Sequence, residues 1–334
     1  MTMKKSILIL ACMMVICSAL SVSAQDALFS FEYQPMRIRF FVGGDAGDAF
    51  GSIVHRGAID AANMLRPFGV EVEYVFSGWQ PDQMISQLRE AIASGVDAIC
   101  MMGHPGVEAI MPLAEDARNA GVIMMYQNTD VAAVRREFGG GFAGVLNLTA
   151  QGERLGNRAI ADLALQPGDR AVVFAPWGSP GRFFREEGVA KTFEGHGMTV
   201  ERIQNPVGVN ADPQLLLPLV TGQLQRYPET RIIVYSGGQL LAAAGMYMEA
   251  NGIAPGEIYN IGFDLNSAVL EGFVNGYVQL SSDQQAYLQG FLPILNAFLT
   301  KNFEFAGLEI DTGANIIDVY NYDELRVLIE QGIR

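Results

Sequence analysis

The feature that most constrains the fold of this 334-residue chain is a regular alternation of short apolar runs with amphipathic stretches. Residues 98–102 (AICMM) are wholly apolar, which is typical of a strand buried on both faces. Residues 81–94 instead place Met84, Leu88 and Ile92 at helical spacing on one face. Because strands and helices follow each other at this rhythm, the sequence predicts right-handed βαβ units around parallel sheets.

The alternation runs through the chain twice in succession. We therefore expect an α/β protein with two similar lobes, each a doubly wound parallel sheet. The expected strands are 37–42, 69–75, 98–102, 122–126, 170–175, 198–203, 231–235 and 258–263. The expected helices are 52–65, 81–94, 107–120, 151–165, 182–195, 213–226, 240–250 and 284–301, with a last one from Asp323.

Residues 1–24 have the composition of a secretory signal peptide. Two lysines precede the apolar stretch 6–20, and the small residues that follow predict cleavage after Ala24. The apolar stretch is shorter than the roughly 20 residues that a membrane-spanning helix needs, so a retained anchor is disfavoured. A second interpretation stays open, because the sequence before Cys12 loosely resembles a lipoprotein processing site.

Charge and cysteine content exclude several classes of function. The formal net charge of −14 becomes more negative when the two N-terminal lysines are removed, which disfavours nucleic acid and anionic membranes as partners. Only Cys100 remains after cleavage, so neither an internal disulfide nor a multi-cysteine zinc site can form. No later segment is long and apolar enough to cross a membrane. We expect a periplasmic protein that is not embedded in a membrane.

Motifs for nucleotide cofactors and for nucleophilic catalysis are missing from the sequence. Gly43-Gly44 with Gly47 does not match the dinucleotide-binding fingerprint, and no phosphate-binding loop motif occurs. Ser179 is followed by Pro180, which breaks the pattern of a nucleophile elbow. The three histidines are far apart and lack metal-ligand spacing. We therefore predict no cofactor, no metal site and no catalytic residues.

Polar and aromatic residues follow many of the expected strands at their carboxyl ends, where open parallel sheets bind ligands. Carboxylates and amides fork to adjacent sugar hydroxyls, and aromatic rings cover the apolar C–H side of a sugar ring. Some of these residues have a competing structural role, since Trp177 could simply pack in the core. The residues are Asp48, Phe50, His104, Asn128, Thr129, Trp177, Asn210, Gly237 and Asp264.

Several short segments also occur in a specific order and spacing. They are 47–50 followed by 56–58, 120–123 leading to Asn128, 185–188, 261–264 and 282–290. Together they resemble the periplasmic sugar-binding proteins of ATP-driven importers, of the type related to ribose-binding protein, and they span nearly the whole mature chain. The resemblance implies the type I periplasmic-binding-protein fold.

For the first lobe, the resemblance implies a polar contact to a sugar hydroxyl at Asp48, ring stacking at Phe50 and a polar contact at Asn128. Two departures from the ribose-type pattern matter. Asn128-Thr129 stands where those proteins have Asp-Arg, and the glycine pair beginning at Gly237 replaces Asn-Asp. A ligand other than ribose is therefore expected, such as a different pentose, a hexose, a polyol or a furanone signal.

For the second lobe and the hinge, the resemblance implies that Arg185 grips the ring oxygen or hydroxyls of the ligand. It also implies that Asp264 binds the ligand and that Gln284 reaches it from a hinge strand. Two of these residues have a second interpretation. Arg185 could be an ordinary exposed helix residue, and Asp264 could cap the next helix.

The resemblance further implies that the two lobes are joined by three crossings of the chain and close by a hinge. The expected first lobe is 37–146 plus 285–303, the second lobe is 147–283 plus 304–334, and the crossings lie near 143–148, 283–286 and 302–306.

The predicted function is capture of a small sugar or polyol, followed by delivery to the membrane permease of an ABC transporter. We expect a monomer. One alternative is a ligand sensor of the same fold that docks on a chemoreceptor or a sensor kinase. Another is binding of a non-sugar such as a nucleoside. An exported α/β enzyme is disfavoured, because no nucleophile lies beside a base in the sequence pattern.

Overall fold

The computed structural model describes residues 31–178 and 183–334 of the protein. The predicted signal peptide, residues 1–24, lies outside the described residues together with its alternative processing site. Residues 31–35 contain no helix or strand, and residues 36–334 form one compact unit. Within the described residues, no helix combines the length and apolar character needed to cross a bilayer.

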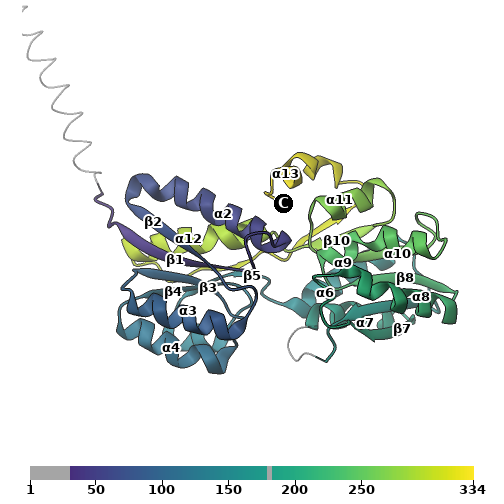
Figure 1. Ribbon diagram of the computed structural model, residues 1–334, viewed down its shortest axis with the longest axis horizontal. Coiled ribbons are helices and arrows are strands. Elements are labelled where there is room, and N and C mark those ends of the chain that lie inside the picture. The colour runs from purple at the N-terminus through teal and green to yellow at the C-terminus, as the bar shows by residue number, and fades with distance from the viewer. Residues whose placement is uncertain (1–30, 179–182) are drawn as a thin grey trace, which may run out of the picture. The chain divides into compact units, whose positions relative to one another are not determined.

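The first lobe is built on a six-stranded sheet. Its strands are β1 (Met36–Gly43), β2 (Val70–Phe76), β3 (Ala98–Met102), β4 (Ile123–Asn128), β5 (Gly141–Gly144) and β11 (Glu309–Asp311). Its helices are α2 (Ala49–Leu65), η1 (Arg66–Phe68), α3 (Pro81–Ala93), α4 (Val107–Asn119), α5 (Ala132–Phe138) and α12 (Ala286–Phe303). The strand order is β11-β5-β4-β3-β1-β2, and all pairs are parallel. Helices α2 and α12 cover one face of this sheet, and α3 and α4 cover the other (Figure 1).

The second lobe repeats this arrangement. Its strands are β6 (Arg170–Ala175), β7 (Thr199–Gln204), β8 (Thr230–Tyr235), β9 (Tyr259–Phe263), β10 (Leu280–Asp283) and β12 (Asn315–Asp318). Its helices are α6 (Leu148–Asp162), α7 (Phe184–Gly195), η2 (Pro213–Leu216), α8 (Leu217–Arg226), α9 (Gly238–Ala242), α10 (Ala244–Ala250), α11 (Ser267–Val274), η3 (Asp323–Leu325) and α13 (Arg326–Glu330). The strand order is β12-β10-β9-β8-β6-β7, the same as in the first lobe. Only the edge pair β10–β12 is antiparallel among the described strands.

The two similar parallel sheets confirm the predicted fold class, while one boundary differs from the prediction. Strand β11 pairs with β5 and so extends the first sheet, although we assigned residues 304–334 to the second lobe. The chain therefore crosses between the sheets at residues 312–314 and not near 302–306. The other two crossings follow β5 and β10. A three-residue edge strand carries too little pattern for sequence reasoning to place it.

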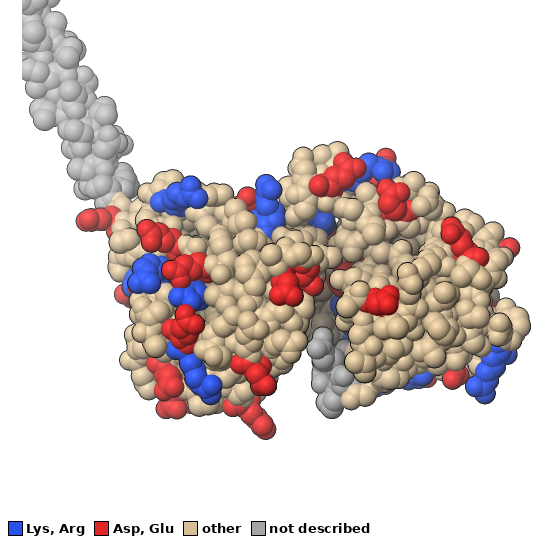
Figure 2. Space-filling view, viewed as in Figure 1, with Lys and Arg blue, Asp and Glu red and all other residues tan. Residues whose placement is uncertain are grey.

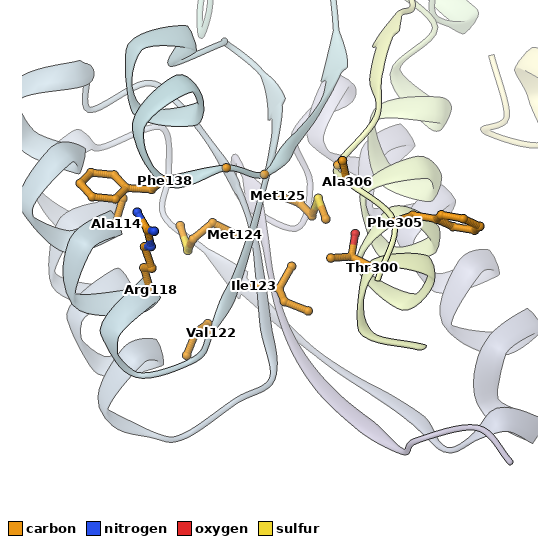
Figure 3. A pocket seen from close by; sticks show the side chains of 13 residues that line it. Ala114, Arg118, Val122, Ile123, Met124, Met125, Phe138, Thr300, Phe305 and Ala306 are labelled. Atoms are coloured by element: carbon orange, nitrogen blue, oxygen red, sulfur yellow. The ribbon is translucent and has the colours of Figure 1, made fainter. Parts of the chain in front are cut away.

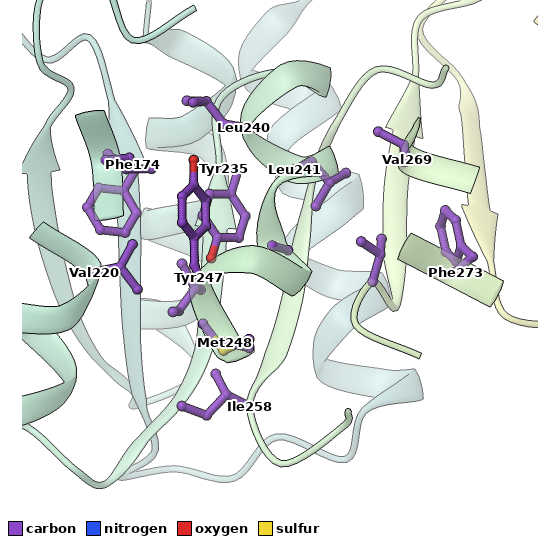
Figure 4. Packing of buried hydrophobic residues seen from close by; sticks show 14 of the residues in the cluster. Phe174, Val220, Tyr235, Leu240, Leu241, Tyr247, Met248, Ile258, Val269 and Phe273 are labelled. Carbon is purple, nitrogen blue, oxygen red and sulfur yellow. The ribbon is translucent and has the colours of Figure 1, made fainter. Parts of the chain in front are cut away.

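The core of the second lobe shows why its strands are apolar throughout. Successive residues of a strand point to opposite faces. Phe174 therefore belongs to a core cluster with residues of α8, α9, α10 and α11, while Val173 belongs to a second cluster with residues of α6 and α7. Figure 4 shows the first of these faces, where Phe174, Tyr235 and Tyr247 lie ring to ring. The ring centroids of Phe174 and Tyr235 are 6.1 Å apart, and those of Tyr235 and Tyr247 are 5.6 Å apart.

Glycines let one pair of helices in each lobe touch backbone to backbone. A Cβ at Gly290 in α12 would lie 1.9 Å from the carbonyl oxygen of Val54 in α2, and Gly57 of α2 makes the reciprocal approach. In the second lobe, a Cβ at Gly152 in α6 would lie 1.8 Å from the carbonyl oxygen of Arg185 in α7. The close approach in the second lobe lies at the first turn of α7, which carries the predicted ligand residue Arg185. The approach in the first lobe lies further along α2, at Val54 and Gly57.

We expect Gly290→Ala to lower the free energy of unfolding by about 1–3 kcal/mol, because the added methyl group forces the two helices apart. The matched control is Gly222→Ala in α8, where an added Cβ meets no atom within 4 Å. The control should be neutral or slightly stabilising, since alanine favours a helix interior over glycine. Urea denaturation measures both changes. Equal stability of Gly290→Ala and the unsubstituted protein would contradict this packing.

Candidate ligand-binding site

The first predicted contact, Asp48, lies in the loop after β1 and caps the N-terminus of α2. Its Oδ1 accepts a hydrogen bond from the backbone N–H of Gly51 at 2.5 Å. Its Oδ2 accepts one from the indole Nε1–H of Trp79 at 3.0 Å. A carboxylate is favoured at this position by the unpaired N–H groups of the first helical turn. The two bonds hold the Asp48 carboxylate in a fixed orientation at the carboxyl end of the first sheet.

Three half-buried rings lie in a row beside Asp48. The centroids of Phe50 and Trp79 are 6.1 Å apart, and those of Trp79 and His104 are 5.4 Å apart. The His104 Nε2 lies 3.4 Å from the hydroxyl of Thr129. The structure thus brings together four predicted residues, Asp48, Phe50, His104 and Thr129. It adds Trp79, which we did not predict. The same rule of strand-end residues, applied to the end of the second strand, would have found it.

Asn128 and Asp264 occupy equivalent positions in the two lobes, at the carboxyl ends of β4 and β9. Both have a left-handed backbone, with φ values of 60° for Asn128 and 72° for Asp264. Non-glycine residues adopt this conformation rarely, and Asn and Asp tolerate it better than most. Such residues cluster at ligand-binding sites, so this shared strain supports a common role for the two side chains.

Gln284 joins these two side chains through hydrogen bonds. Its Oε1 accepts a bond from Asn128 Nδ2 at 3.4 Å, and its Nε2 donates to Asp264 Oδ1 at 2.6 Å. Asn128 Nδ2 also donates to Gln289 Oε1 at 3.1 Å. Gln284 is 8% exposed and Gln289 is fully buried. One predicted residue of the first lobe, one of the second lobe and one of the hinge therefore form one hydrogen-bonded group, to which the structure adds Gln289.

Arg185 extends this group within the second lobe. Its Nη1 lies 3.7 Å from Asp264 Oδ1, and its Nη2 donates to the carbonyl oxygen of Ser236 at 2.6 Å. Its guanidinium carbon lies 4.4 Å from the ring centroid of Phe263. The exposed fraction of the Arg185 side chain is 18%, so it is not an ordinary surface arginine.

The buried carboxylate of Glu186 pairs with the guanidinium of Arg185. Its Oε1 accepts a hydrogen bond from Arg185 Nε at 2.9 Å, and its side chain is 1% exposed. Burial raises the pKa of the Glu186 carboxyl, and the Arg185 guanidinium opposes that rise. A buried carboxylate in this position holds the guanidinium in place and fixes which of its N–H groups remain for a ligand. Sequence reasoning did not assign Glu186 a role.

The remaining predicted residues differ in their surroundings. Gly237 lies beside Asp264, since a Cβ at Gly237 would be 3.9 Å from Asp264 Oδ2. Trp177 donates to the carbonyl oxygen of Val173 at 3.3 Å, and its ring lies 5.5 Å from that of Phe183. Asn210 is exposed in the loop after β7. The contacts of Trp177 match the packing interpretation, while Asn210 stays a prediction.

A cavity of about 360 Å³ lies elsewhere in the first lobe (Figure 3). Its lining includes Ile123 and Met124 at the start of β4, whereas Asn128 stands at the other end of that strand. None of the predicted ligand residues lines it. Ser179 lies outside the described residues.

The polar and aromatic residues at the strand ends of the two sheets combine hydrogen-bond acceptors, hydrogen-bond donors and aromatic ring faces. Asp48 and Asp264 supply carboxylates, Arg185 supplies N–H groups, and Trp79 supplies a ring face. This set suits a small molecule with several hydroxyls, because each hydroxyl both donates and accepts.

Among the described residues, no group of three or more His, Cys, Asp or Glu side chains is placed to hold a metal ion. On the described part of the face in Figure 2, acidic and basic residues are interspersed.

Two lobes of this topology, with polar side chains at the strand ends of both, define a two-lobed α/β binding protein. Residues 39–299 match the periplasmic binding protein domain, and the chain belongs to that family. This membership agrees with the predicted binding role. The chain is 28% identical over 255 residues to the xylose/arabinose-binding protein of Sulfolobus acidocaldarius. The match covers 70% of this chain and 60% of that relative's length.

Solved structures share the fold over most of the chain. The periplasmic ribose ABC transporter protein of Conexibacter woesei has a TM-score of 0.75 at 20% identity, covering 92% of this chain and 100% of its own. A carbohydrate transporter protein of Acidothermus cellulolyticus, in complex with myo-inositol, has a TM-score of 0.74 at 20% identity, with coverages of 90% and 100%. A solute-binding protein of Burkholderia graminis, in complex with D-arabinose, has a TM-score of 0.73 at 18% identity, with coverages of 88% and 98%. These likenesses confirm the predicted fold.

We expect Glu186→Ala to lower the free energy of unfolding by about 1–3 kcal/mol, because it removes the carboxylate that bonds to the Nε of a largely buried arginine. The neighbouring Glu187 pairs with Arg202 and is 23% exposed, so Glu187→Ala is a matched control with a smaller cost. Chemical denaturation gives both values. A Glu186→Ala protein no less stable than Glu187→Ala would contradict the supporting role of Glu186.

Proposed function

We propose that this protein captures a small sugar or polyol between its two lobes and delivers it to an ABC transporter. The observation that carries the proposal is the hydrogen-bonded link from Asn128 through Gln284 to Asp264. Side chains at the strand ends of both sheets are thereby within reach of one small molecule. A ligand that bonds to both lobes at once favours the closed arrangement over the open one.

The proposed ligand has several adjacent hydroxyls and an apolar ring face. Asp264 and Arg185 would hold neighbouring hydroxyls, since a carboxylate accepts and a guanidinium donates in fixed directions. Phe50 and Trp79 would cover the apolar side of the ring. One relative named for xylose and arabinose, and a solved structure with bound D-arabinose, support a pentose as the first candidate.

The proposal places the mature protein in the periplasm as a monomer. The predicted signal peptide, residues 1–24, supports export with cleavage after Ala24, and family membership supports the same location. The permease of an ABC transporter is the proposed partner. The alternative of a sensor that docks on a chemoreceptor or kinase uses the same ligand site, and transport of the bound sugar in cells would separate the two.

The test is a thermal-shift screen of residues 25–334 against D-xylose, D- and L-arabinose, D-ribose, D-fucose, myo-inositol, nucleosides and amino acids. A ligand that binds only the folded state stabilises it by about 4 kcal/mol at a thousand times its dissociation constant, so one sugar or polyol should raise the melting temperature clearly. Asp264→Asn and Arg185→Ala should each abolish that shift. A shift with a nucleoside or amino acid alone would overturn the sugar assignment.

The matched control for Arg185 is Arg231→Ala. Arg231 lies at the start of β8, away from the strand ends, and donates to the hydroxyl of Tyr259 at 2.8 Å. This variant should keep the full ligand-induced shift. Loss of the shift in the control, or its survival in Asp264→Asn, would contradict the proposed location of the site.

A further inference from the structure

Arg334 bonds to the two residues that flank the bridging glutamine, Gln284. Its Nη2 lies 3.2 Å from Asp283 Oδ2, and its Nη1 donates to Gln285 Oε1 at 3.0 Å. Asp283 ends β10 and Gln285 precedes α12, so the guanidinium spans the point where the chain passes from the second sheet to the first lobe. The planar fork of an arginine suits two acceptors held side by side in this way.

The backbone around Gln284 needs such support. Gln285 has a left-handed conformation with φ of 53°, which is strained for a glutamine. Asp283 is 4% exposed, and its Oδ1 accepts a hydrogen bond from the Gln285 N–H at 2.8 Å. Besides the contact with Arg334, Asp283 Oδ2 accepts a hydrogen bond from Asn315 Nδ2 at 3.3 Å. A buried carboxylate left without its cation is costly, so this turn depends on the guanidinium.

The same turn is tied to the third crossing of the chain. Gln285 Nε2 donates to the carbonyl oxygen of Thr312 at 2.8 Å, and Gln289 donates to the Thr312 hydroxyl at 3.1 Å. Thr312 is fully buried, and its N–H donates to the carbonyl oxygen of Gly144 at 2.9 Å. The three crossings therefore meet at Thr312, with Arg334 bonded to one side of this meeting point.

We propose that Arg334 is a positioning residue for ligand binding: by clamping Asp283 and Gln285, it orients Gln284 between Asn128 and Asp264. This proposal takes the identity of its ligand from the proposed function. The contacts of Arg334 do not depend on that function. Arg334 itself makes no contact with the ligand in this account. Arg334 affects ligand binding by fixing the orientation of the Gln284 side chain, which bonds to both lobes.

The test compares Arg334→Ala with Arg326→Ala. Arg326 belongs to the same C-terminal segment, and its ion-pair partner Asp323 is 73% exposed. Calorimetry with the sugar that gives the largest thermal shift should show affinity weakened about threefold to tenfold in Arg334→Ala, the cost of about one hydrogen bond. Arg326→Ala should bind like the unsubstituted protein. Arg334→Lys should restore only part of the affinity, because an ammonium cannot fork to both acceptors.

A double-mutant cycle separates positioning from a general loss of stability. In a Gln284→Ala background, Arg334→Ala should cause no further loss of affinity, since the side chain it orients is gone. Equal losses of affinity in the presence and absence of Gln284 would overturn the proposal. So would unchanged affinity in Arg334→Ala.

Hydrogen exchange of the ligand-free protein tests the clamp if no sugar binds and the proposed function fails. The amide of Gln285 is protected by Asp283, so peptides covering residues 280–288 should exchange faster in Arg334→Ala than in Arg326→Ala. Equal exchange in the two variants would overturn the clamp whatever the ligand. Faster exchange with no sugar binding would retain the clamp and reject the sugar.

Discussion

The hydrogen-bonded link from Asn128 through Gln284 to Asp264 is the interaction on which the rest of this account depends. Parallel strands bring their carboxyl ends to one edge of a sheet, so each lobe alone collects polar side chains there. A binding site shared by both lobes also needs a residue that connects the carboxyl-terminal edge of one sheet with that of the other. Gln284 makes that connection because it lies where the chain passes from β10 to α12.

The two lobes position their strand-end residues with the same structural features. Each places a residue with left-handed backbone at the end of its fourth strand, Asn128 or Asp264. Each also packs one helix against a neighbouring helix through glycines. In the second lobe, the close approach at Gly152 fixes the backbone of Arg185, and Glu186 fixes its side chain. Rigid lobes that meet at a small set of crossings are what hinge closure around a ligand requires.

Much of this organisation could be predicted from the sequence, because long apolar strands and amphipathic helices carry strong periodic signals. The strands β5, β10, β11 and β12 were missed, since they are short and rich in glycine or polar residues. Trp79 and Glu186 were missed for a different reason. Their roles come from side chains far away in the sequence or from burial, as the bond from Trp79 to Asp48 illustrates. The roles of Arg185 and Gln284 rested on resemblance alone, whereas Asp264 was also predicted from its place at a strand end. The contacts among the three side chains could not be predicted.

The most direct test of the central claim is a crystal structure of the protein with the sugar or polyol that it binds most tightly. The account predicts a single ligand in hydrogen-bond contact with Asn128 of the first lobe and with Asp264 and Arg185 of the second. A ligand held by residues of one lobe alone, or bound in the cavity beside Met124, would contradict it.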